Sequence, residues 1–150
     1  MRAIVQRVRD ASVSVDGAVS GSIGLGLLVY LGICDTDTEE ICTRMASKIA
    51  RMRIFQDAED KMNLNVSDVG GAVLVVSQFT LYASMKKGNR PSFDGAGKPE
   101  RADKLYEFFM DQLRAFGLHV EHGVFGAHMH VVYENDGPVT MIMDSDELFN

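Results

Sequence analysis

The sequence predicts an α+β domain in which mixed, largely antiparallel β-sheet carries two helices packed on one side. Three observations favour this class. The expected elements run in the order strands, helix, strand, helix, strands, which differs from the regular alternation of a doubly wound nucleotide fold. Hydrophobic residues make up 46% of the chain, enough for one ordinary core. A length of 150 residues fits a single domain spanning 1–150.

The first residues carry strand and turn signals. Ala3–Val8 is typical of a strand, and Ser12–Val15 alternates small polar residues with valine, as a strand with one wet face does. Asp16-Gly17 predicts a tight hairpin, because glycine accepts the positive φ that such turns need. Gly24–Ile33 is a nearly continuous apolar run and therefore predicts a buried strand.

The first helix is expected to begin near Thr36. Thr36 and Glu39 have the spacing of a capping box, in which a hydroxyl and a carboxylate satisfy the free N–H groups of a helix end. Apolar residues then recur at helical spacing and predict a core-facing stripe of Ile41, Met45, Ile49 and Met52. A hairpin-like stretch follows around Asp60–Asn65.

The second half repeats the pattern of strand, loop, helix and strands. Ala72–Tyr82 is strongly apolar and predicts a strand, whereas Ser84–Lys98 has the composition of a loop. Pro99 suits the first turn of a second helix, and Gly117 suits its end. The apolar stripe of that helix is Ala102, Leu105, Phe109, Leu113 and Phe116. Two strands are then expected at Val124–Tyr133 and Val139–Met143.

The charge of the chain bounds its partners. A net charge of −6 argues against nucleic acid, which usually demands a basic footprint. One basic cluster exists, Lys86, Lys87 and Arg90, and composition alone favours a solvated loop for it. Charge returns too early in the chain for a signal peptide, and no apolar run approaches the roughly 20 residues that span a bilayer. We therefore expect a cytoplasmic chain without membrane contact, in which Cys34 and Cys42 stay reduced and buried.

Four histidines raise a metal-dependent hydrolase as a competing hypothesis. His119, His122, His128 and His130 lie within twelve residues of one another. On a strand, His128 and His130 would share one face and could bind zinc if a third ligand arrived. No HExxH or comparable spacing supports such a site, so the preferred interpretation is polar surface histidines with no metal and no other cofactor.

Two features leave their chemistry open at the level of sequence. Thr80 is a possible nucleophile, but a threonine hydroxyl is weak unless a base activates it, and no Ser/His/Asp arrangement can be assigned to it. On chemistry alone, a strand threonine with a locally bonded hydroxyl is the better interpretation. Gly137-Pro138 reads as a turn between strands, and such a bond becomes cis at a cost of only about 0.5–1 kcal/mol. The sequence does not decide the isomer.

Two segments resemble signatures of the D-aminoacyl-tRNA deacylase family. Val75-Val76-Ser77-Gln78-Phe79-Thr80-Leu81 is similar to the first signature and Asn135-Asp136-Gly137-Pro138-Val139-Thr140 to the second. Six-residue signatures in the right order and at the right separation are highly specific. The likeness extends to about Met143, so Asp144–Asn150 is assigned no role. It also includes Gln6-Arg7-Val8, Gly26-Leu27-Leu28, Arg53-Ile54-Phe55, Lys61 to Val66, Arg90-Pro91-Ser92-Phe93 and Phe125-Gly126-Ala127.

The resemblance implies an activity and an assembly. The activity is hydrolysis of the ester that joins a D-amino acid, or achiral glycine, to the 3′ end of tRNA. The assembly is a homodimer of β/β/α-layered subunits with two sites at the subunit interface. The resemblance further implies that Gly137-Pro138 is cis and reaches into the partner's pocket, where carbonyl oxygens select the substrate amino group and an L side chain would clash. Rejection by clash fails for glycine, which has no side chain.

The same resemblance marks Ser77, Gln78, Phe79 and Thr80 as the catalytic segment. On a continuous strand, Ser77 and Phe79 would share one face and Gln78 and Thr80 the other. Backbone N–H groups near Phe79 and Thr80 could then form an oxyanion hole, and one such donor is typically worth about 10²–10³ in rate. An aminoacyl ester is already activated and has a neighbouring ribose 2′-OH, so we expect positioning and oxyanion stabilisation to suffice without a side-chain nucleophile.

The remaining expected contacts concern the tRNA. Phe125, Ala127 and Met129 would share one strand face and could form an apolar wall for the terminal adenosine or the aminoacyl group, with plain core as the alternative. Lys86, Lys87 and Arg90 follow the Thr80 segment and could meet acceptor-stem phosphates. A non-catalytic, acidic dimeric binding module that keeps the fold is the alternative to an enzyme.

Overall fold

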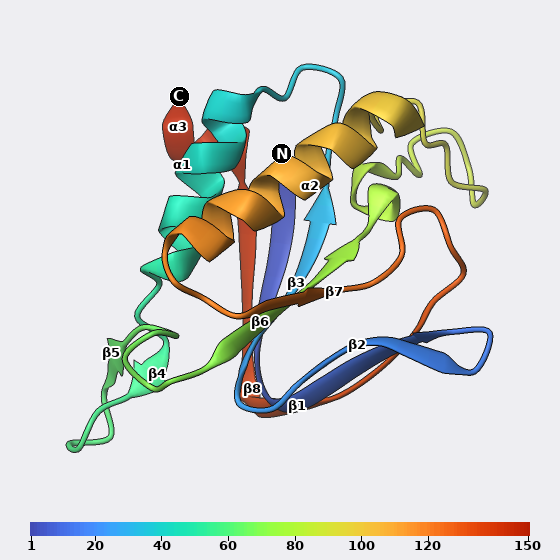
Figure 1. The fold of residues 1–150 in the computed structure, drawn as a ribbon. Coiled ribbons are helices and arrows are strands. Elements are labelled where there is room, and N and C mark those ends of the chain that lie inside the picture. Colours follow the sequence, from blue (N-terminus) through green and yellow to red (C-terminus); the bar gives the residue numbers. More distant parts are fainter.

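The computed structural model describes all 150 residues as one mixed sheet with helices on one face (Figure 1). A separate small hairpin extends from it. The elements in chain order are β1 Arg2–Val15, β2 Ala18–Ile23, β3 Gly26–Gly32, α1 Glu39–Ala50, β4 Phe55–Gln56, β5 Met62–Leu64, β6 Ala72–Ser77, a 3₁₀ helix η1 at Phe79–Tyr82, α2 Pro99–Ala115, β7 Val120–His122, β8 His130–Asp144 and α3 Ser145–Phe149.

The long strand β1 organises the sheet. Its first half pairs with β3 and its second half with β2, while β8 runs antiparallel along its other side. The order is β2-β1-β3-β6-β7, with β3-β6 and β6-β7 parallel. The predicted mixed, largely antiparallel sheet is therefore confirmed. The strands predicted at Ala3–Val8 and Ser12–Val15 are one continuous strand, because β8 pairs with both parts.

The main core lies between the sheet and the helices α1 and α2, which cover the same face (Figure 1). Met45 and Ile49 of α1 are fully buried, as are Phe109 and Leu113 of α2. Both predicted helical stripes are thus confirmed in their central residues. The exception is Phe116, which caps α2 at the surface. Cys42 is buried in this core, which raises the pKa of its thiol to about 12, whereas Cys34 is only half-buried.

The opposite face of the sheet is only partly covered. The second half of β1 and β2 swing to this side (Figure 1) and enclose a smaller cluster that includes Val13, Leu28 and Leu74. Beyond that cluster the face is open. Ile4 pairs with Tyr30 on one side and with Ile142 on the other, and Ile142 is 83% exposed. An apolar row therefore crosses an uncovered face.

Turn chemistry follows the sequence closely. Asp16 and Gly17 both have positive φ, 51° and 79°, as the predicted hairpin between β1 and β2 requires. The predicted hairpin near Asp60 is β4-β5. Pro99 is the first residue of α2, and Gly117 follows that helix with a φ of 79°. No helix is long and apolar enough to cross a membrane.

Two predicted boundaries are wrong, and the structure adds a third helix to the predicted two. The cap of α1 is Thr38, whose hydroxyl accepts from Ile41 N, because Asp37 N donates to Cys34 O and the resulting turn precludes a start at Thr36. A third helix, α3, follows β8 because the side chain of Asp144 accepts from Asp146 N and caps it. The strand predicted at Val124–Tyr133 begins only at His130, after a loop.

Candidate active site

The predicted catalytic segment, Ser77 to Thr80, lies where β6 ends and the chain turns. The strand stops at Ser77, and Gln78 N donates to Leu31 O at 2.8 Å, the last bond that holds the segment to β3. Phe79 then begins a 3₁₀ helix. The prediction that a strand continues to Tyr82 is wrong, and the expected alternation of Ser77 and Phe79 against Gln78 and Thr80 is lost with it. The physical cause is the neighbouring strand, because β3 ends at Gly32 and offers no further ladder.

The turn leaves two backbone N–H groups without a partner inside the helix. Phe79 and Thr80 are the first residues of the 3₁₀ helix, and the first N–H groups of a helix have no partner within it. Both residues are exposed. The oxyanion hole expected from these two N–H groups stays a prediction.

The hydroxyl of Thr80 has a side-chain amide for a partner rather than a base. Gln78 Nε2 donates to Thr80 Oγ1. No histidine or carboxylate is hydrogen-bonded to this hydroxyl. An amide cannot accept the hydroxyl proton as a base does, so the arrangement does not activate Thr80 as a nucleophile.

A cavity of about 490 Å³ opens on one side of this turn, within the usual size range of ligand pockets. Phe79 and Phe93 meet edge to face across its mouth, with ring centroids 4.9 Å apart. Phe125 lies deeper, and its ring is 5.8 Å from that of buried Tyr106, whose hydroxyl donates to Val75 O. We call this the aromatic cavity. Its lining is Leu31, Ile33, Ser77, Gln78, Phe79, Phe93, Ala96, Gly97, Lys98, Pro99, Ala102, Phe125 and Gly126.

A smaller cavity of about 220 Å³ lies against the same turn. We call it the side cavity. It shares Ser77, Gln78, Phe79 and Gly126 with the aromatic cavity. Its other lining residues are Val76, Ala127, His128, Met129 and Val131. The catalytic segment thus forms a partition between two hollows.

The prediction of a single apolar wall is wrong. Phe125, Ala127 and Met129 lie in the loop before β8, so they do not alternate on a strand face as predicted. A turn in which Ala127 N donates to Val124 O, with Gly126 at a φ of 75°, divides them. As a result Phe125 lines the aromatic cavity, whereas Ala127 and Met129 line the side cavity.

The second signature forms a projecting loop within β8. The Gly137-Pro138 bond is cis and both residues are exposed. Asn135 Oδ1 accepts from Val139 N at 2.9 Å and so closes the loop at its base. Arg7, buried in the sheet, holds the loop from behind: its Nε donates to Asp136 O at 3.1 Å.

The two signatures do not meet within one chain. Through β1 and β3, Ser77 is level with Met143 at the end of β8. Asn135 is level with Ala72 at the start of β6, five residues before Ser77. Three strand spacings also separate β8 from β6, so the signatures lie roughly 20 Å apart. Neither cavity beside Ser77 is lined by a residue of the second signature.

Comparisons with known proteins identify the family of the chain. The sequence profile described as D-Tyr-tRNA(Tyr) deacylase matches residues 4–144. The chain belongs to this deacylase family. A D-aminoacyl-tRNA deacylase of Koribacter versatilis is 58% identical over 149 residues, which cover 99% of this chain and all of that protein. A D-aminoacyl-tRNA deacylase of Aquifex aeolicus is 53% identical over 99% of this chain and all of its own.

Solved structures share the fold. One titled c-Myc DNA Unwinding Element Binding Protein has a TM-score of 0.89 and 42% sequence identity, over 96% of this chain and 98% of its own. Another, titled as a probable eukaryotic D-amino acid tRNA deacylase, has a TM-score of 0.82 at 18% identity, over 95% of this chain and 97% of its own. The mixed sheet with its helices is therefore a fold of this deacylase family.

The remaining predicted residues of this family member lie outside both cavities. Lys86, Lys87 and Arg90 are exposed in the loop after η1, which a bridge between Ser84 and Ser92 closes at its base. None of the three basic side chains forms an ion pair. They are therefore free to meet an anion near the catalytic turn.

The histidines do not assemble a metal site. His119 pairs with Glu121 at 3.5 Å, and the Nδ1 atom of His122 lies 2.6 Å from Gly123 O. His128 and His130 stack edge to face on each other, with ring centroids 5.1 Å apart. No group of three or more His, Cys, Asp or Glu side chains converges anywhere in the chain. The metal-dependent hydrolase has no support in this geometry.

The structure draws attention to two residues to which the sequence analysis assigned no role in the site. Lys98 lines the aromatic cavity from the N-terminal end of α2. Arg7 is 4% exposed and donates to Ile54 O at 2.7 Å and to Gln56 Oε1 at 2.6 Å, which ties the Gly137 loop to the β4-β5 hairpin. A signal for Arg7 exists, since an arginine within a buried strand requires partners.

Proposed function

We propose that the chain is a D-aminoacyl-tRNA deacylase, which hydrolyses the ester between a D-amino acid or glycine and the 3′ end of tRNA. The observation that carries the proposal is the turn after β6, where Ser77, Gln78 and Phe79 border two cavities of unequal size and the exposed 3₁₀ helix begins. Such a partition suits an ester substrate, in which the carbonyl carbon joins an amino acid on one side to the terminal adenosine on the other. A tRNA substrate places this proofreading of translation in the cytoplasm.

The turn supplies the electrostatic part of the reaction. Water attacks the ester carbonyl carbon, and the carbonyl oxygen gains negative charge beside the N–H groups of Phe79 and Thr80. The bond between the carbonyl carbon and the ribose 3′ oxygen then breaks as the 3′ oxygen takes a proton. Fixed backbone donors are worth most where charge develops, because they need no reorganisation. The ribose 2′-OH stands next to the ester and can relay the proton. Gln78 holds Thr80 in place rather than activating it.

The cavities divide the substrate. The aromatic cavity suits the terminal adenosine, since Phe79, Phe93 and Phe125 offer ring faces and edges to a base. Lys98 at its rim suits the adjoining phosphate. The side cavity, with Ser77, Ala127 and Met129, suits the aminoacyl group.

Chiral selection uses Gly137-Pro138 of a second copy. The loop projects, is anchored by Arg7, and lies too far from its own chain's Ser77 to act there. Backbone carbonyls of this loop would accept from the substrate amino group, and an L side chain would collide with the loop. Backbone acceptors cannot rotate away, so the rejection is independent of which side chain the substrate carries. Glycine passes because it has nothing to collide.

A homodimer therefore forms part of the proposal. The row of Ile4, Tyr30 and Ile142 supports it, because an isoleucine 83% exposed beside two other apolar side chains is typical of an interaction surface. This face carries β8, and thus the Gly137 loop, so its burial would bring each loop toward the partner. The basic loop residues Lys86, Lys87 and Arg90 would meet acceptor-stem phosphates next to the site.

The experiment that tests the function compares D-tyrosyl-tRNA with L-tyrosyl-tRNA. Release of D-tyrosine with little release of L-tyrosine is the expected result, and glycyl-tRNA should also be hydrolysed. Equal treatment of both enantiomers contradicts the chiral role. Absence of any release contradicts the deacylase and leaves a non-catalytic binding module. Activity that EDTA abolishes and zinc restores would instead favour the histidine hypothesis.

A further inference from the structure

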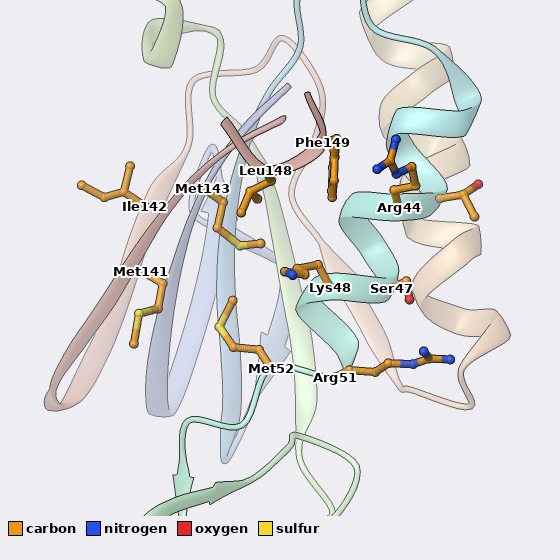
Figure 2. A pocket seen from close by; sticks show the side chains of 11 residues that line it. Arg44, Ser47, Lys48, Arg51, Met52, Met141, Ile142, Met143, Leu148 and Phe149 are labelled. Carbon is orange, nitrogen blue, oxygen red and sulfur yellow. The ribbon is translucent and has the colours of Figure 1, made fainter. Parts of the chain in front are cut away.

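A third cavity has a volume of about 820 Å³ and is thus larger than the aromatic and side cavities. It lies beside β8, whereas the turn at Phe79 and Thr80 follows β6. Figure 2 shows it between α1 and the last part of β8, with α3 closing one end. The proposed reaction uses none of its residues. Its lining residues are Thr43, Arg44, Ser47, Lys48, Arg51, Met52, Met141, Ile142, Met143, Leu148 and Phe149.

The floor of this cavity is apolar and adaptable. Met52, just after α1, and Met143 of β8 extend toward each other, and Leu148 and Phe149 of α3 stand above them (Figure 2). Methionine side chains are flexible and polarizable, so they fit flat or irregular ligands equally well. The side chain of Ile142 points to the other side of the strand (Figure 2), away from this floor.

Two free cations border the floor. The guanidinium of Arg44 lies over the Phe149 ring, 4.3 Å from its centroid, and Lys48 reaches from α1 toward β8 (Figure 2). Both residues are exposed, neither forms an ion pair, and no carboxylate lines the cavity. In a chain of net charge −6, two unpaired cations over an apolar floor favour an anion that carries a flat apolar group.

The strand β8 connects this cavity to the Gly137 loop, which we call the chiral loop after its proposed role. Met143 follows Pro138 by five residues, which is about 17 Å at the usual rise of a strand. If Gly137-Pro138 touches the aminoacyl group in the partner's site, the RNA attached to that group passes the same subunit within this distance. About five stacked nucleotides, at a rise of ~3.4 Å each, span this distance, and fewer nucleotides span it if the RNA is extended.

We propose that this cavity binds the single-stranded RNA next to the terminal adenosine of the tRNA held in the partner subunit's active site. Arg44 and Lys48 take phosphates, and the floor formed by Met52, Met143 and Phe149 takes a base. Sites for single-stranded nucleic acid combine these same elements, a cationic border and an apolar or aromatic platform. The inference rests on the proposed deacylase function and on the cross-subunit position of Gly137-Pro138.

The test uses two substrates that differ only in RNA length. One is 3′-D-tyrosyl-adenosine, and the other is an RNA hairpin with a single-stranded 3′ end charged with D-tyrosine. The double variant Arg44→Gln/Lys48→Gln should lose about tenfold in kcat/KM on the hairpin and nothing on the adenosine ester. The salt dependence of hairpin binding should also flatten, by about 0.7 in slope for each lost phosphate contact.

Lys104→Gln is the control. Lys104 is an exposed cation on α2, pairs with Glu100 at 3.3 Å and does not line this cavity. Its substitution should leave both substrates unaffected. Equal loss with Lys104→Gln, equal loss on both substrates, or no loss on the hairpin would each overturn the proposal.

Binding of the uncharged hairpin, followed by fluorescence anisotropy, separates this proposal from the deacylase itself. If the wild-type protein hydrolyses neither ester, the proposed function fails, yet weaker hairpin binding by the double variant still supports the cavity. Adenosine monophosphate and an acidic peptide serve as competitors at the same charge concentration. Displacement of the hairpin by either one, as effectively as by an RNA oligonucleotide, would overturn the assignment to RNA.

Discussion

The Arg7 guanidinium is hydrogen-bonded to the backbone carbonyl of Asp136 and, through another nitrogen, to that of Ile54, at 3.1 and 2.7 Å. One buried cation thereby joins the chiral loop to the β4-β5 hairpin. Because a carbonyl does not move when side chains change, this link sets the position of Gly137 relative to the sheet.

Arg7→Lys should therefore damage both stability and selectivity. Lysine keeps the charge but lacks the planar fork, so at least one buried carbonyl loses its donor at a cost of about 1–3 kcal/mol. We expect a lower free energy of unfolding in urea and a smaller ratio of D- to L-tyrosyl-tRNA hydrolysis. Arg9→Lys is the control, since Arg9 is exposed and pairs with Asp136 only at the surface, where ion pairs are worth about 0–1 kcal/mol. Equal effects in both variants would count against the anchoring role.

Thr80→Ala separates covalent from non-covalent hydrolysis. Because the only partner of the Thr80 hydroxyl is the Gln78 amide, we expect the variant to stay within about tenfold of wild-type single-turnover rate. A substrate whose terminal ribose carries 2′-hydrogen in place of 2′-OH should be hydrolysed far more slowly by the wild-type protein. Complete loss of turnover in Thr80→Ala, together with a trappable acyl-enzyme, would establish threonine as the nucleophile instead.

Gly137→Ala tests the chiral loop. Gly137 has a φ of 132°, which L side chains rarely adopt, and an added Cβ would lie 2.7 Å from Val139 Cγ2. We expect lower D-substrate turnover or weaker discrimination, measured as the D/L ratio, with the oligomeric state unchanged. Gly88→Ala is matched in backbone conformation, with a φ of 129° and nothing within 4 Å of the new Cβ. It should keep the wild-type ratio, since any loss of RNA affinity in that loop affects both enantiomers alike.

Ile142→Glu tests the dimer. A charge placed in the apolar row beside Ile4 should oppose burial of that face, because a buried unpaired carboxylate is strongly unfavourable. Sedimentation at micromolar concentration should show about twice the chain mass for the wild type and a shift to single-chain mass for the variant, with activity falling in parallel. Val19→Glu is the control. Val19 is a β-branched apolar side chain on β2 that is 65% exposed, and its replacement should leave the sedimenting mass unchanged. An active protein that is strictly monomeric would refute the two-copy site.

Neutralising Lys86, Lys87 and Arg90 tests the basic loop. Replacing each by glutamine should weaken tRNA binding across sequences and reduce the slope of log affinity against log salt by roughly one for each lost phosphate contact. Lys61→Gln, on the exposed β4-β5 hairpin, provides the control. An unchanged salt slope in the triple variant would mean that these residues do not contact phosphates and belong to an ordinary solvated loop.

Much of this protein follows from local patterns in its sequence. The helical stripe with Met45 and Ile49, the turn at Asp16-Gly17 and the proline at the start of α2 depend on residues close together in the chain, so periodicity and φ preferences suffice to predict them. The two signatures identify the family for the same reason, because each is a short contiguous segment.

Tertiary structure decided the rest. Where β6 ends depends on the length of β3 beside it, which is why Phe79 and Thr80 form a helical turn rather than strand. The division of Phe125 from Met129 depends on a loop folded against two other segments, and the anchoring of Gly137 depends on Arg7, 130 residues earlier in the chain. The sequence by itself determined which segments match the family signatures. Their separation on opposite ends of one sheet was decided by strand register, which long-range pairing sets and local preference does not.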